Sequence, residues 1–426
     1  KAAGVKVFGT SVDDIDRAED RERFDEVLEQ TNIARPQGAS VTNVEDAVKA
    51  AEKIGYPSMV RPSYVLGGRA MEIVYNEDEL RDYMNRAVKV TPDHPVLIDH
   101  YMQGTEVEVD AIADGETVVI PGIMEHIERA GVHSGDSIAV YPPQTLSSKV
   151  IFTIIDYTKR LGLNLNVKGL LNIQYVVVND NVYVIEVNPR SSRTVPFLSK
   201  VTDINMVELA TRAALGEKLT DLGLKSGLVE PKPYVALKAP VFSFAKMQDV
   251  DISLGPEMKS TGEVMGIDYH YARALYKAIT GAGMNIPHEG TILFTVANKD
   301  KEEMKQLGRA FAELGFKIAA TEGTAKALKE VGVESSIVYK VHERGQNVGS
   351  DRSSDIIKMI KAGGINMVIT TQTPGQKFAK DGFRIRRATV EHGIACLTSL
   401  DTAWEVLRVL SFIRERRLVY SLALQD

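Results

Sequence analysis

Cysteine and tryptophan are almost absent from this sequence, and so are long apolar segments. Its 426 residues include one cysteine, Cys396, and one tryptophan. A single cysteine excludes an internal disulfide and a thiolate metal cluster, and is typical of a reducing compartment. No run approaches the roughly 18 apolar residues that a membrane-spanning helix needs, and the first residues lack a signal-peptide layout. We therefore expect a cytoplasmic protein with no membrane partner.

An excess of basic residues is also absent. The chain has 51 Lys and Arg against 57 Asp and Glu, which gives a net charge of −6 and a pI near 5.9. Such a chain has no general phosphate-binding surface, so we expect no nucleic acid partner, and any anionic ligand needs local arginines. Apolar residues make up 44% and charged residues 25%, as in an ordinary globular protein of two or three domains.

The chain also lacks an initiator methionine. Residues 1–9 have the pattern of a strand and turn already in progress, so we expect the sequence to be a piece of a longer protein. Structure that precedes this piece could matter for its function.

Helix and strand patterns alternate along most of the chain, which predicts an α/β protein. Asn43 can cap a helix that ends at Gly55. A strand at 58–60 then leads through a glycine-containing loop, residues 63–69, to a strand at 71–74. This order disfavours the Walker and dinucleotide-binding motifs, in which a helix follows the glycine loop.

Two further patterns concern the next part of the chain. A strand at 96–99 precedes alternating polar and apolar residues at 106–111, which predict an antiparallel strand with one face in solvent. Residues 125–136 show no periodicity and contain His126 and His133, so we predict a mobile loop there.

The pattern changes near residue 286, where we place a domain boundary. Beyond it, short apolar strands alternate with four helical stretches, which predicts a doubly wound parallel sheet. The predicted strands are residues 292–296, 317–319, 337–339, 367–370 and 394–397.

One segment in the middle of the chain has the pattern of a β-hairpin. Two strands flank residues 179–181. With these three residues as the loop, Gln174 lies opposite Glu186, and Asn172 lies opposite Asn188 on the same face. A slip of one residue would bury one of the polar groups, so the pattern predicts a polar cluster. The other face is apolar and is predicted to be core: Ile173, Tyr175, Val177, Tyr183, Ile185 and Val187.

Gln174, Glu186 and Asn188 together suggest a metal site. Their oxygens carry one formal negative charge, which suits a hard cation that takes other ligands from water or phosphate, such as magnesium with ATP. Arg190 and Arg193 follow directly, where phosphate groups would lie. The alternative is a solvated polar strand end, which is common for any single residue of this kind but does not account for the arginines.

Four segments together resemble a known family. Residues 56–70 and 185–190 are similar to the two ATP-grasp signatures of the large subunit of carbamoyl phosphate synthetase, and residues 131–136 and 255–266 extend the similarity. The resemblance covers nearly the whole chain and fits the C-terminal half of that subunit. It implies an α/β protein in which an α+β ATP-grasp domain is followed by a doubly wound parallel-sheet regulatory domain.

The resemblance also implies domain boundaries and partners. The N-terminal synthetase half of the subunit is missing from this chain and is an implied partner, together with a glutaminase small subunit; a homo-oligomer is compatible with the family. The implied parts are a remnant of the preceding subdomain (1–20), the ATP-grasp domain (21–216), its extension and linker (217–286) and a methylglyoxal-synthase-like allosteric domain (287–426).

An ATP site is implied at matching positions. Arginines there contact phosphates, the glycine pair lets a backbone loop close over them, and Glu106 holds the ribose. Without the family, the glycines predict only a turn, Glu106 a surface carboxylate, and a lone histidine a structural role. The implied ATP-binding residues are Arg21, Arg61, Gly67, Gly68, Asp99, His100, Met102, Glu106, His133 and Ser134.

The implied reaction is in-line attack of a carbamate oxygen on ATP, which gives carbamoyl phosphate and ADP for pyrimidine and arginine synthesis. Gln174, Glu186 and Asn188 match the ligands of Mg²⁺ or Mn²⁺, with two ions expected per ATP. The implied catalytic residues are Arg190, Arg193 and His133.

A regulatory site is implied after the strand ends of the last domain, where anions bind to helix N-termini. The implied residues are Lys301, Thr321, Thr324, Lys340 and Thr370. Ordinary helix capping is the alternative for the first two threonines. Thr370 stands where some relatives have asparagine, so the effector stays open, with UMP as the leading candidate.

Two other functions remain as alternatives. Another ATP-grasp carboxylate ligase, such as a biotin carboxylase, fits the hairpin, but lysine is expected where Arg61 stands. A catalytically inactive nucleotide-binding module is the second alternative, because the upstream part is missing. Such a module would bind ATP without turnover.

Overall fold

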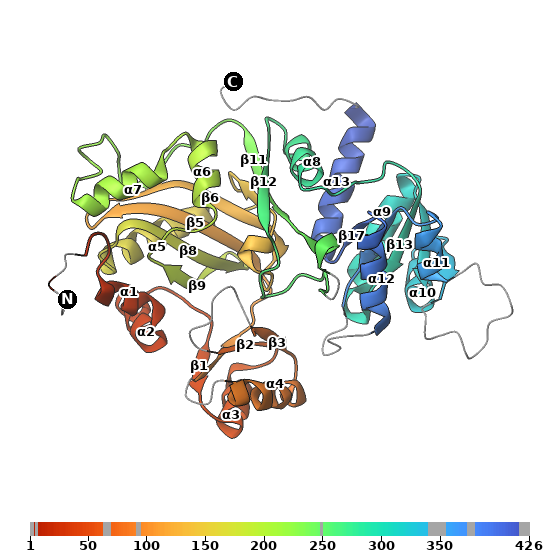
Figure 1. Cartoon of the computed structure of the whole chain (residues 1–426), viewed down its shortest axis with the longest axis horizontal. Coiled ribbons are helices and arrows are strands. Elements are labelled where there is room, and N and C mark those ends of the chain that lie inside the picture. The colour runs from red at the N-terminus through yellow and green to blue at the C-terminus, as the bar shows by residue number, and fades with distance from the viewer. Residues whose placement is uncertain are drawn as a thin grey trace. The chain divides into compact units, whose positions relative to one another are not determined.

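The computed structural model describes residues 4, 7–62, 70–90, 95–247, 250–339, 355–372 and 380–416 (Figure 1). Two compact units divide the chain, one of residues 1–238, 267–274 and 422–426 and the other of residues 239–266 and 275–421. Gly67, Gly68 and Lys340 lie outside the described residues. Within the described part, no helix combines the length and the apolar character that crossing a membrane requires.

The first unit begins with two helices and a small antiparallel sheet that two further helices cover. Among the described residues its strand order is β1-β4-β2-β3. Asn43 caps α3 by accepting from the amide of Asp46, and Gly55 ends that helix with φ of 92°, as the sequence predicts. The elements are α1 (Val12–Glu19), α2 (Arg21–Gln30), β1 (Gly38–Val41), α3 (Val44–Ile54), β2 (Ser58–Pro62), β3 (Glu72–Val74), α4 (Glu77–Val90) and β4 (Val96–His100).

A larger sheet follows. In the described part of the chain its strand order is β12-β11-β7-β6-β5-β8-β9, with β10 paired to β6. The elements are β5 (Thr105–Asp114), β6 (Val118–Arg129), η1 (Ser134–Asp136), β7 (Ala139–Tyr141), α5 (Ser148–Asn164), β8 (Lys168–Val178), β9 (Asn181–Asn188), α6 (Val195–Thr202), α7 (Met206–Leu215), β10 (Gly227–Leu228), β11 (Val235–Val241), η2 (Phe244–Lys246), β12 (Gly262–Asp268) and α8 (Tyr271–Gly281).

The apolar core of this sheet lies between its central strands and α5. Val107, Val109 and Ala111 of β5 pack in one buried cluster with Ile154 and Leu161 of α5. Because side chains alternate along a strand, Glu106, Glu108 and Asp110 point to the opposite face. The sheet therefore has an apolar face under α5 and a face on which acidic side chains gather.

Strands β5 and β6 differ from the sequence prediction. The polar face of β5 is buried rather than solvent-exposed, since Glu106 and Asp110 are only 4% and 1% accessible. The predicted loop at 125–136 is wrong for its first residues, because β6 continues to Arg129 and includes the buried His126. Glu125, His126 and Glu128 are buried polar residues, so the end of β6 lacks the apolar side chains that would mark it as a strand in the sequence.

Hairpin β8–β9 confirms the predicted partners but not the predicted loop. Gln174 pairs with Glu186, and Asn172 with Asn188, as predicted. The turn has two residues, Asn179 and Asp180, with φ of 50° and 59°, as a type I′ turn requires.

The shorter turn changes which residues of β9 reach the core. A register shift after Gln174 restores the predicted pairing at the far end of the hairpin. Near the turn, Val182 and Val184 are buried in the core, whereas Tyr183 and Ile185, which were predicted there, are only partly buried. Between the turn and the bulge, the side chains of β9 that point into the core are therefore the ones predicted to point away from it.

The second unit contains a parallel sheet with helices between its strands, as predicted. Its strand order in the described residues is β15-β14-β13-β16-β17, and all its paired neighbours are parallel. The elements are β13 (Thr291–Thr295), η3 (Asn298–Asp300), α9 (Lys301–Glu313), β14 (Lys317–Thr321), α10 (Glu322–Glu330), β15 (Ser336–Val338), α11 (Ile356–Lys361), β16 (Met367–Thr370), α12 (Lys380–Glu391), β17 (Ala395–Leu397) and α13 (Leu400–Arg416).

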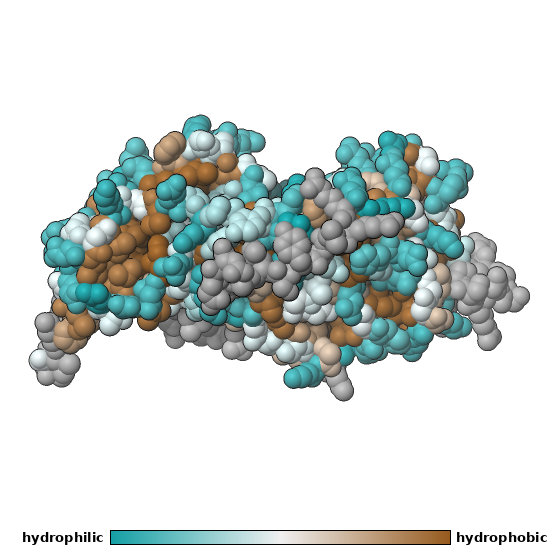
Figure 2. Space-filling view, turned by 90° about the horizontal axis from the view of Figure 1, so that it is seen from above, coloured by the Kyte–Doolittle hydropathy of each residue, from teal (hydrophilic) through white to brown (hydrophobic). Residues whose placement is uncertain are grey.

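The surface carries scattered apolar side chains. Figure 2 shows hydrophobic patches between hydrophilic side chains on the face that it displays. Phe152 of α5 and Val207 and Leu215 of α7 are among the exposed large apolar residues, at 71%, 55% and 61% accessibility. Single exposed apolar residues of this kind are normal on soluble domains.

Candidate active site and anion site

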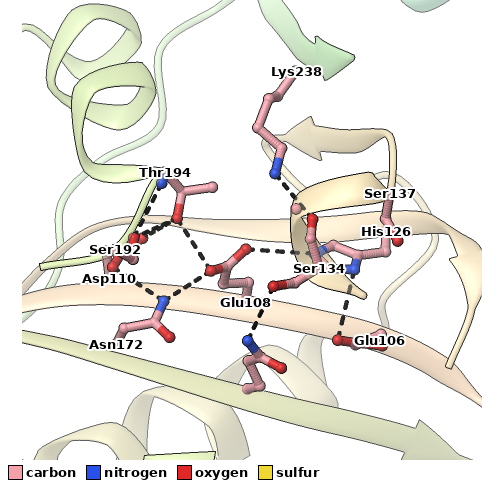
Figure 3. A network of polar contacts seen from close by, with 12 residues as sticks. Glu106, Glu108, Asp110, His126, Ser134, Ser137, Asn172, Ser192, Thr194 and Lys238 are labelled. Atoms are coloured by element: carbon pink, nitrogen blue, oxygen red, sulfur yellow. Dashed lines mark hydrogen bonds and ion pairs between the residues drawn. The ribbon is translucent and has the colours of Figure 1, made fainter. Parts of the chain in front are cut away.

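A row of carboxylates lies on one face of β5. Glu106, Glu108 and Asp110 are buried, and Figure 3 shows all three on the same side of the strand. Buried carboxylates are costly unless other polar groups compensate for the lost water. Their partners therefore define the site.

Asn172 and Thr194 supply hydrogen bonds to two of these carboxylates. Nδ2 of Asn172, on the neighbouring strand β8, donates to Oε1 of Glu108 at 2.8 Å and to Oδ1 of Asp110 at 3.1 Å. The hydroxyl of Thr194 lies 3.1 Å from the same Oε1 and also contacts Oδ2 of Asp110. Glu108 and Asp110 thus share one amide and one hydroxyl (Figure 3).

His126 and Lys238 border the other end of the row. Nε2 of His126 lies 3.6 Å from Oε2 of Glu108, and Nδ1 lies 3.9 Å from Oε1 of Glu106. Both distances exceed a normal hydrogen bond. Lys238 of β11 is 1% accessible, and its Nζ donates to the carbonyl of Ser134 at 3.1 Å.

The buried groups have shifted pKa values. Burial, with the nearby charges of Glu108 and Glu186, raises the pKa of Glu106 to about 8. Burial and the charge of Glu108 also raise the pKa of Asp110. Burial acts on Glu108 in the same direction, but the contact with His126 and the charge of Lys238 outweigh it, and its pKa lies below the usual range. The row therefore combines neutral and charged carboxyl groups near neutral pH.

The hairpin places its three predicted ligands together. Nδ2 of Asn188 donates to Oε1 of Glu186 at 3.0 Å, and Nε2 of Gln174 donates to Oγ of Ser134 at 3.1 Å. Nη2 of Arg190 donates to Oδ1 of Asn188 at 3.2 Å. Helix η1, which begins at Ser134, therefore contacts the hairpin at Gln174.

His133 is the N-cap residue of the short helix η1. Its Nδ1 accepts a hydrogen bond from the amide of Gly135 at 3.0 Å. Burial lowers the pKa of His133, so the ring is neutral near pH 7. Because Nδ1 accepts, the proton of the neutral ring is on Nε2.

Arg21, Asp99, Arg61 and Glu186 form a chain of ion pairs that links four elements. Nη2 of Arg21 lies 2.6 Å from Oδ1 of Asp99. Nη2 of Arg61 lies 3.9 Å from Oδ2 of Asp99, and its Nη1 lies 3.9 Å from Oε2 of Glu186. A β-carbon at Gly38 would collide with the Arg21–Asp99 pair, so a larger residue there would displace these two side chains. Helix α2 and strands β2, β4 and β9 thus converge at these groups.

In the second unit, the predicted anion-binding residues lie near the carboxyl ends of β13, β14 and β16. Thr321 begins α10 without a side-chain capping bond, and its hydroxyl instead donates to Oγ1 of Thr324 at 3.2 Å. A β-carbon at Gly323 would lie 3.0 Å from Nζ of Lys301, which places that ammonium at the start of α10. Thr370 ends β16 beside β13. Ordinary side-chain capping therefore does not describe Thr321.

Two segments of the chain match known families. Residues 20–222 match the family described as "Carbamoyl-phosphate synthase L chain, ATP binding domain", and residues 303–398 match the family described as "MGS-like domain". The chain joins an ATP-grasp domain to an MGS-like domain. This combination agrees with the mixed architecture of the two units.

Solved structures share the ATP-grasp fold. The biotin carboxylase–β,γ-ATP complex from Campylobacter jejuni is 18% identical with a TM-score of 0.52, covering 66% of this chain and 69% of that chain. The biotin carboxylase domain of Hydrogenobacter thermophilus 2-oxoglutarate carboxylase, in complex with MgADP, ADP and bicarbonate, is 18% identical with a TM-score of 0.53. The match covers 66% of this chain and 69% of that chain. The N5-carboxyaminoimidazole synthase from Aspergillus clavatus, in complex with ADP and aminoimidazole ribonucleotide, is 13% identical with a TM-score of 0.52. The match covers 66% of this chain and 77% of that chain. Identities this low establish the fold alone.

Within the ATP-grasp domain, the predicted residues lie in several places. Arg61 and Asp99 lie near Glu186, whereas His100 ends β4 and Met102 follows it in a half-buried position. Arg193 is exposed on the loop after β9. Glu106 is buried beside His126 rather than exposed. The roles assigned to all these residues stay predictions.

Sequence reasoning missed several buried polar residues of the ATP-grasp domain: Glu108, Asp110, Lys238 and Thr194. The alternation of β5 placed the two acids on the correct face, but predicted that face to be in solvent. Thr194 precedes Val195 and Pro196 and has the sequence signal of a helix start, which suggests a cap. Pairing with distant acids has no local sequence signal.

Proposed function

We propose that the ATP-grasp domain binds ATP and transfers its γ-phosphoryl group to carbamate, which gives carbamoyl phosphate and ADP. The observation that carries this proposal is the cluster of Gln174, Glu186 and Asn188 beside Arg61 and Arg190. The match of this domain to the carbamoyl-phosphate synthase family supports carbamate as the acceptor.

The donor set of the cluster fits a divalent metal bound with a nucleotide. It offers one carboxylate and two amide oxygens, which are ligands that Mg²⁺ and Mn²⁺ accept. The Glu186 side chain is 37% exposed, so a metal–nucleotide complex can reach it. When bound, the metal neutralises charge on the phosphate oxygens. We propose two such ions for each ATP.

The cationic and neutral donors around the cluster have separate tasks. The guanidinium groups of Arg61 and Arg190 can bind phosphate oxygens through two parallel hydrogen bonds. Arg61 is oriented for this by Asp99 and Glu186 on either side. Nε2–H of neutral His133 can donate to an oxygen of the transferred group without adding charge. We assign Arg193, on the same loop as Arg190, to the carbamate.

For the MGS-like domain we propose binding of a phosphorylated effector, with UMP as the first candidate. The hydroxyl groups of Thr321 and Thr324 and the ammonium of Lys301 gather at the start of α10, where the helix favours an anion. As proposed partners we retain an N-terminal synthetase half and a glutaminase subunit, which would supply carbamate and ammonia. The cytoplasm is the proposed compartment.

The direct test is ATP formation from ADP and carbamoyl phosphate by the full chain with Mg²⁺. This partial reaction needs neither glutamine nor a partner. We expect turnover that disappears with EDTA and returns with Mg²⁺ or Mn²⁺. Binding of ADP without any ATP formation would favour an inactive nucleotide-binding module. ATP hydrolysis that depends on biotin and bicarbonate would favour a biotin carboxylase.

A further inference from the structure

The loop between β9 and α6 contains both arginines that follow the candidate metal ligands. It begins after Asn188 and ends at Thr194, and Arg190 and Arg193 are exposed on it. An exposed loop positions a side chain accurately only when both ends of the loop are held in place. A loop that is not held samples many conformations, because its conformational entropy favours them.

Thr194 holds the far end of this loop in an unusual way. It occupies the N-cap position of α6, yet its hydroxyl makes no capping hydrogen bond. The side chain is 1% accessible, and the hydroxyl contacts Oδ2 of Asp110 and lies 3.1 Å from Oε1 of Glu108. The residue thus directs its polar group into the sheet instead of stabilising its own helix (Figure 3). Oγ of Ser192, within the loop, lies 2.7 Å from the same hydroxyl.

The near end of the loop reaches the same carboxylates through one amide. Nδ2 of Asn188 donates to Oδ1 of Asn172 at 3.4 Å, and Nδ2 of Asn172 donates to Glu108 and Asp110. Both ends of the loop are therefore tied to one pair of buried acids on β5. A shift of the Thr194 end would take a hydroxyl donor from the buried acids, and a shift of the Asn188 end would take a donor from Oδ1 of Asn172, so both shifts are opposed.

We propose that Thr194 is a positioning residue, anchored by Asp110 and Glu108, that places Arg190 and Arg193 for phosphoryl transfer. The consequence for catalysis rests on the proposed function, whereas the anchoring itself does not. Thr194 need not touch the substrate, since a misplacement of about 1 Å in a charged group can reduce a rate roughly a hundredfold.

The experiment compares three variants of the full chain. Thr194→Val removes the hydroxyl with little change in shape, and Thr194→Ser retains a hydroxyl. Thr202→Val is the matched control, because Thr202 is also buried on α6 but its hydroxyl donates to the carbonyl of Leu198 in the same helix. The first readout is amide hydrogen exchange of residues 190–194 without nucleotide, which requires no catalytic activity. The second is kcat and KM for ATP formation from ADP and carbamoyl phosphate.

We expect Thr194→Val to accelerate exchange in the loop about tenfold and to lower kcat about 10- to 100-fold, with a much smaller change in KM for ADP. Thr194→Ser should restore both values to within about threefold of the parent. The inference is overturned if Thr194→Val leaves loop exchange unchanged, or if Thr202→Val changes both readouts equally. Faster loop exchange with unchanged kcat would overturn the positioning role. A parent that lacks turnover refutes the proposed function, while exchange still decides whether Thr194 anchors the loop.

Discussion

Replacing Glu106 by glutamine should make the ATP-grasp domain more stable at alkaline pH than the parent protein. Burial raises the pKa of Glu106 from 4.5 to about 8. The folded protein therefore holds this proton more tightly than the unfolded chain does. The contribution of Glu106 to stability is fully present below pH 4.5 and is lost as the pH rises towards 8.

The size of the effect follows from the two pKa values. Each pH unit between them costs about 1.4 kcal/mol of unfolding free energy, so the full loss is at most about 5 kcal/mol. Glutamine has the shape of the protonated acid and does not ionise. Between pH 5 and pH 8.5, Glu106→Gln should gain about 4 kcal/mol of stability relative to the parent.

The assay must report on the correct unit. The only tryptophan, Trp404, lies in the second unit, so tryptophan fluorescence would follow the other part of the chain. We therefore suggest urea-dependent hydrogen exchange of peptides from β5, measured at both pH values. Glu26→Gln is the control, since it removes the same charge from an exposed side chain. A stability difference between Glu106→Gln and the parent that does not change with pH would refute the reasoning.

Three other substitutions test the proposed sites. Glu186→Gln should lower Mg²⁺-dependent ATP formation about a hundredfold or more with an unchanged circular dichroism spectrum, because it removes the single charge of the ligand set; an active variant would refute the metal assignment. Arg61→Lys keeps the charge but loses the two-pronged donor, so calorimetry should show about tenfold weaker MgADP binding, and equal affinity would leave Arg61 only its ion pairs with Asp99 and Glu186. Thr324→Val should weaken UMP binding to the full chain about tenfold, whereas Thr324→Ser should bind normally; equal affinity for both variants would return this threonine to a structural role.

Local patterns in the sequence were enough for part of the architecture. The cap at Asn43, the end at Gly55 and the alternation of strands and helices beyond residue 290 depend on interactions within a few residues, and the structure has them. The pairing of Gln174 with Glu186 could also be predicted, because only one register keeps both polar groups off the apolar core. The predicted domain boundaries and residue roles remain to be tested.

The hairpin loop shows where local reasoning stops. A two-residue turn at Asn179 and Asp180 and a three-residue loop both fit the sequence. They differ in which alternate side chains of β9 point into the core near the turn. In the structure the shorter turn occurs together with a bulge: Val184 packs in the same core cluster as residues of α5, and Glu186 keeps its predicted partner Gln174. A compensating pair of irregularities of this kind has no signal in either strand alone.

Only the tertiary structure decided what covers the acidic face of β5. Alternation predicts which side chains share a face of the strand. The same alternating pattern, however, fits a polar face that is exposed to solvent and a polar face that is buried in a hydrogen-bonded network. Asn172 and Thr194, which lie 62 and 84 positions from Asp110 in the chain, approach it once β8 and α6 are in place. Whether Asp110 contacts water or a threonine hydroxyl is therefore set by segments distant in sequence, because burial depends on what packs above a strand and not on the strand itself.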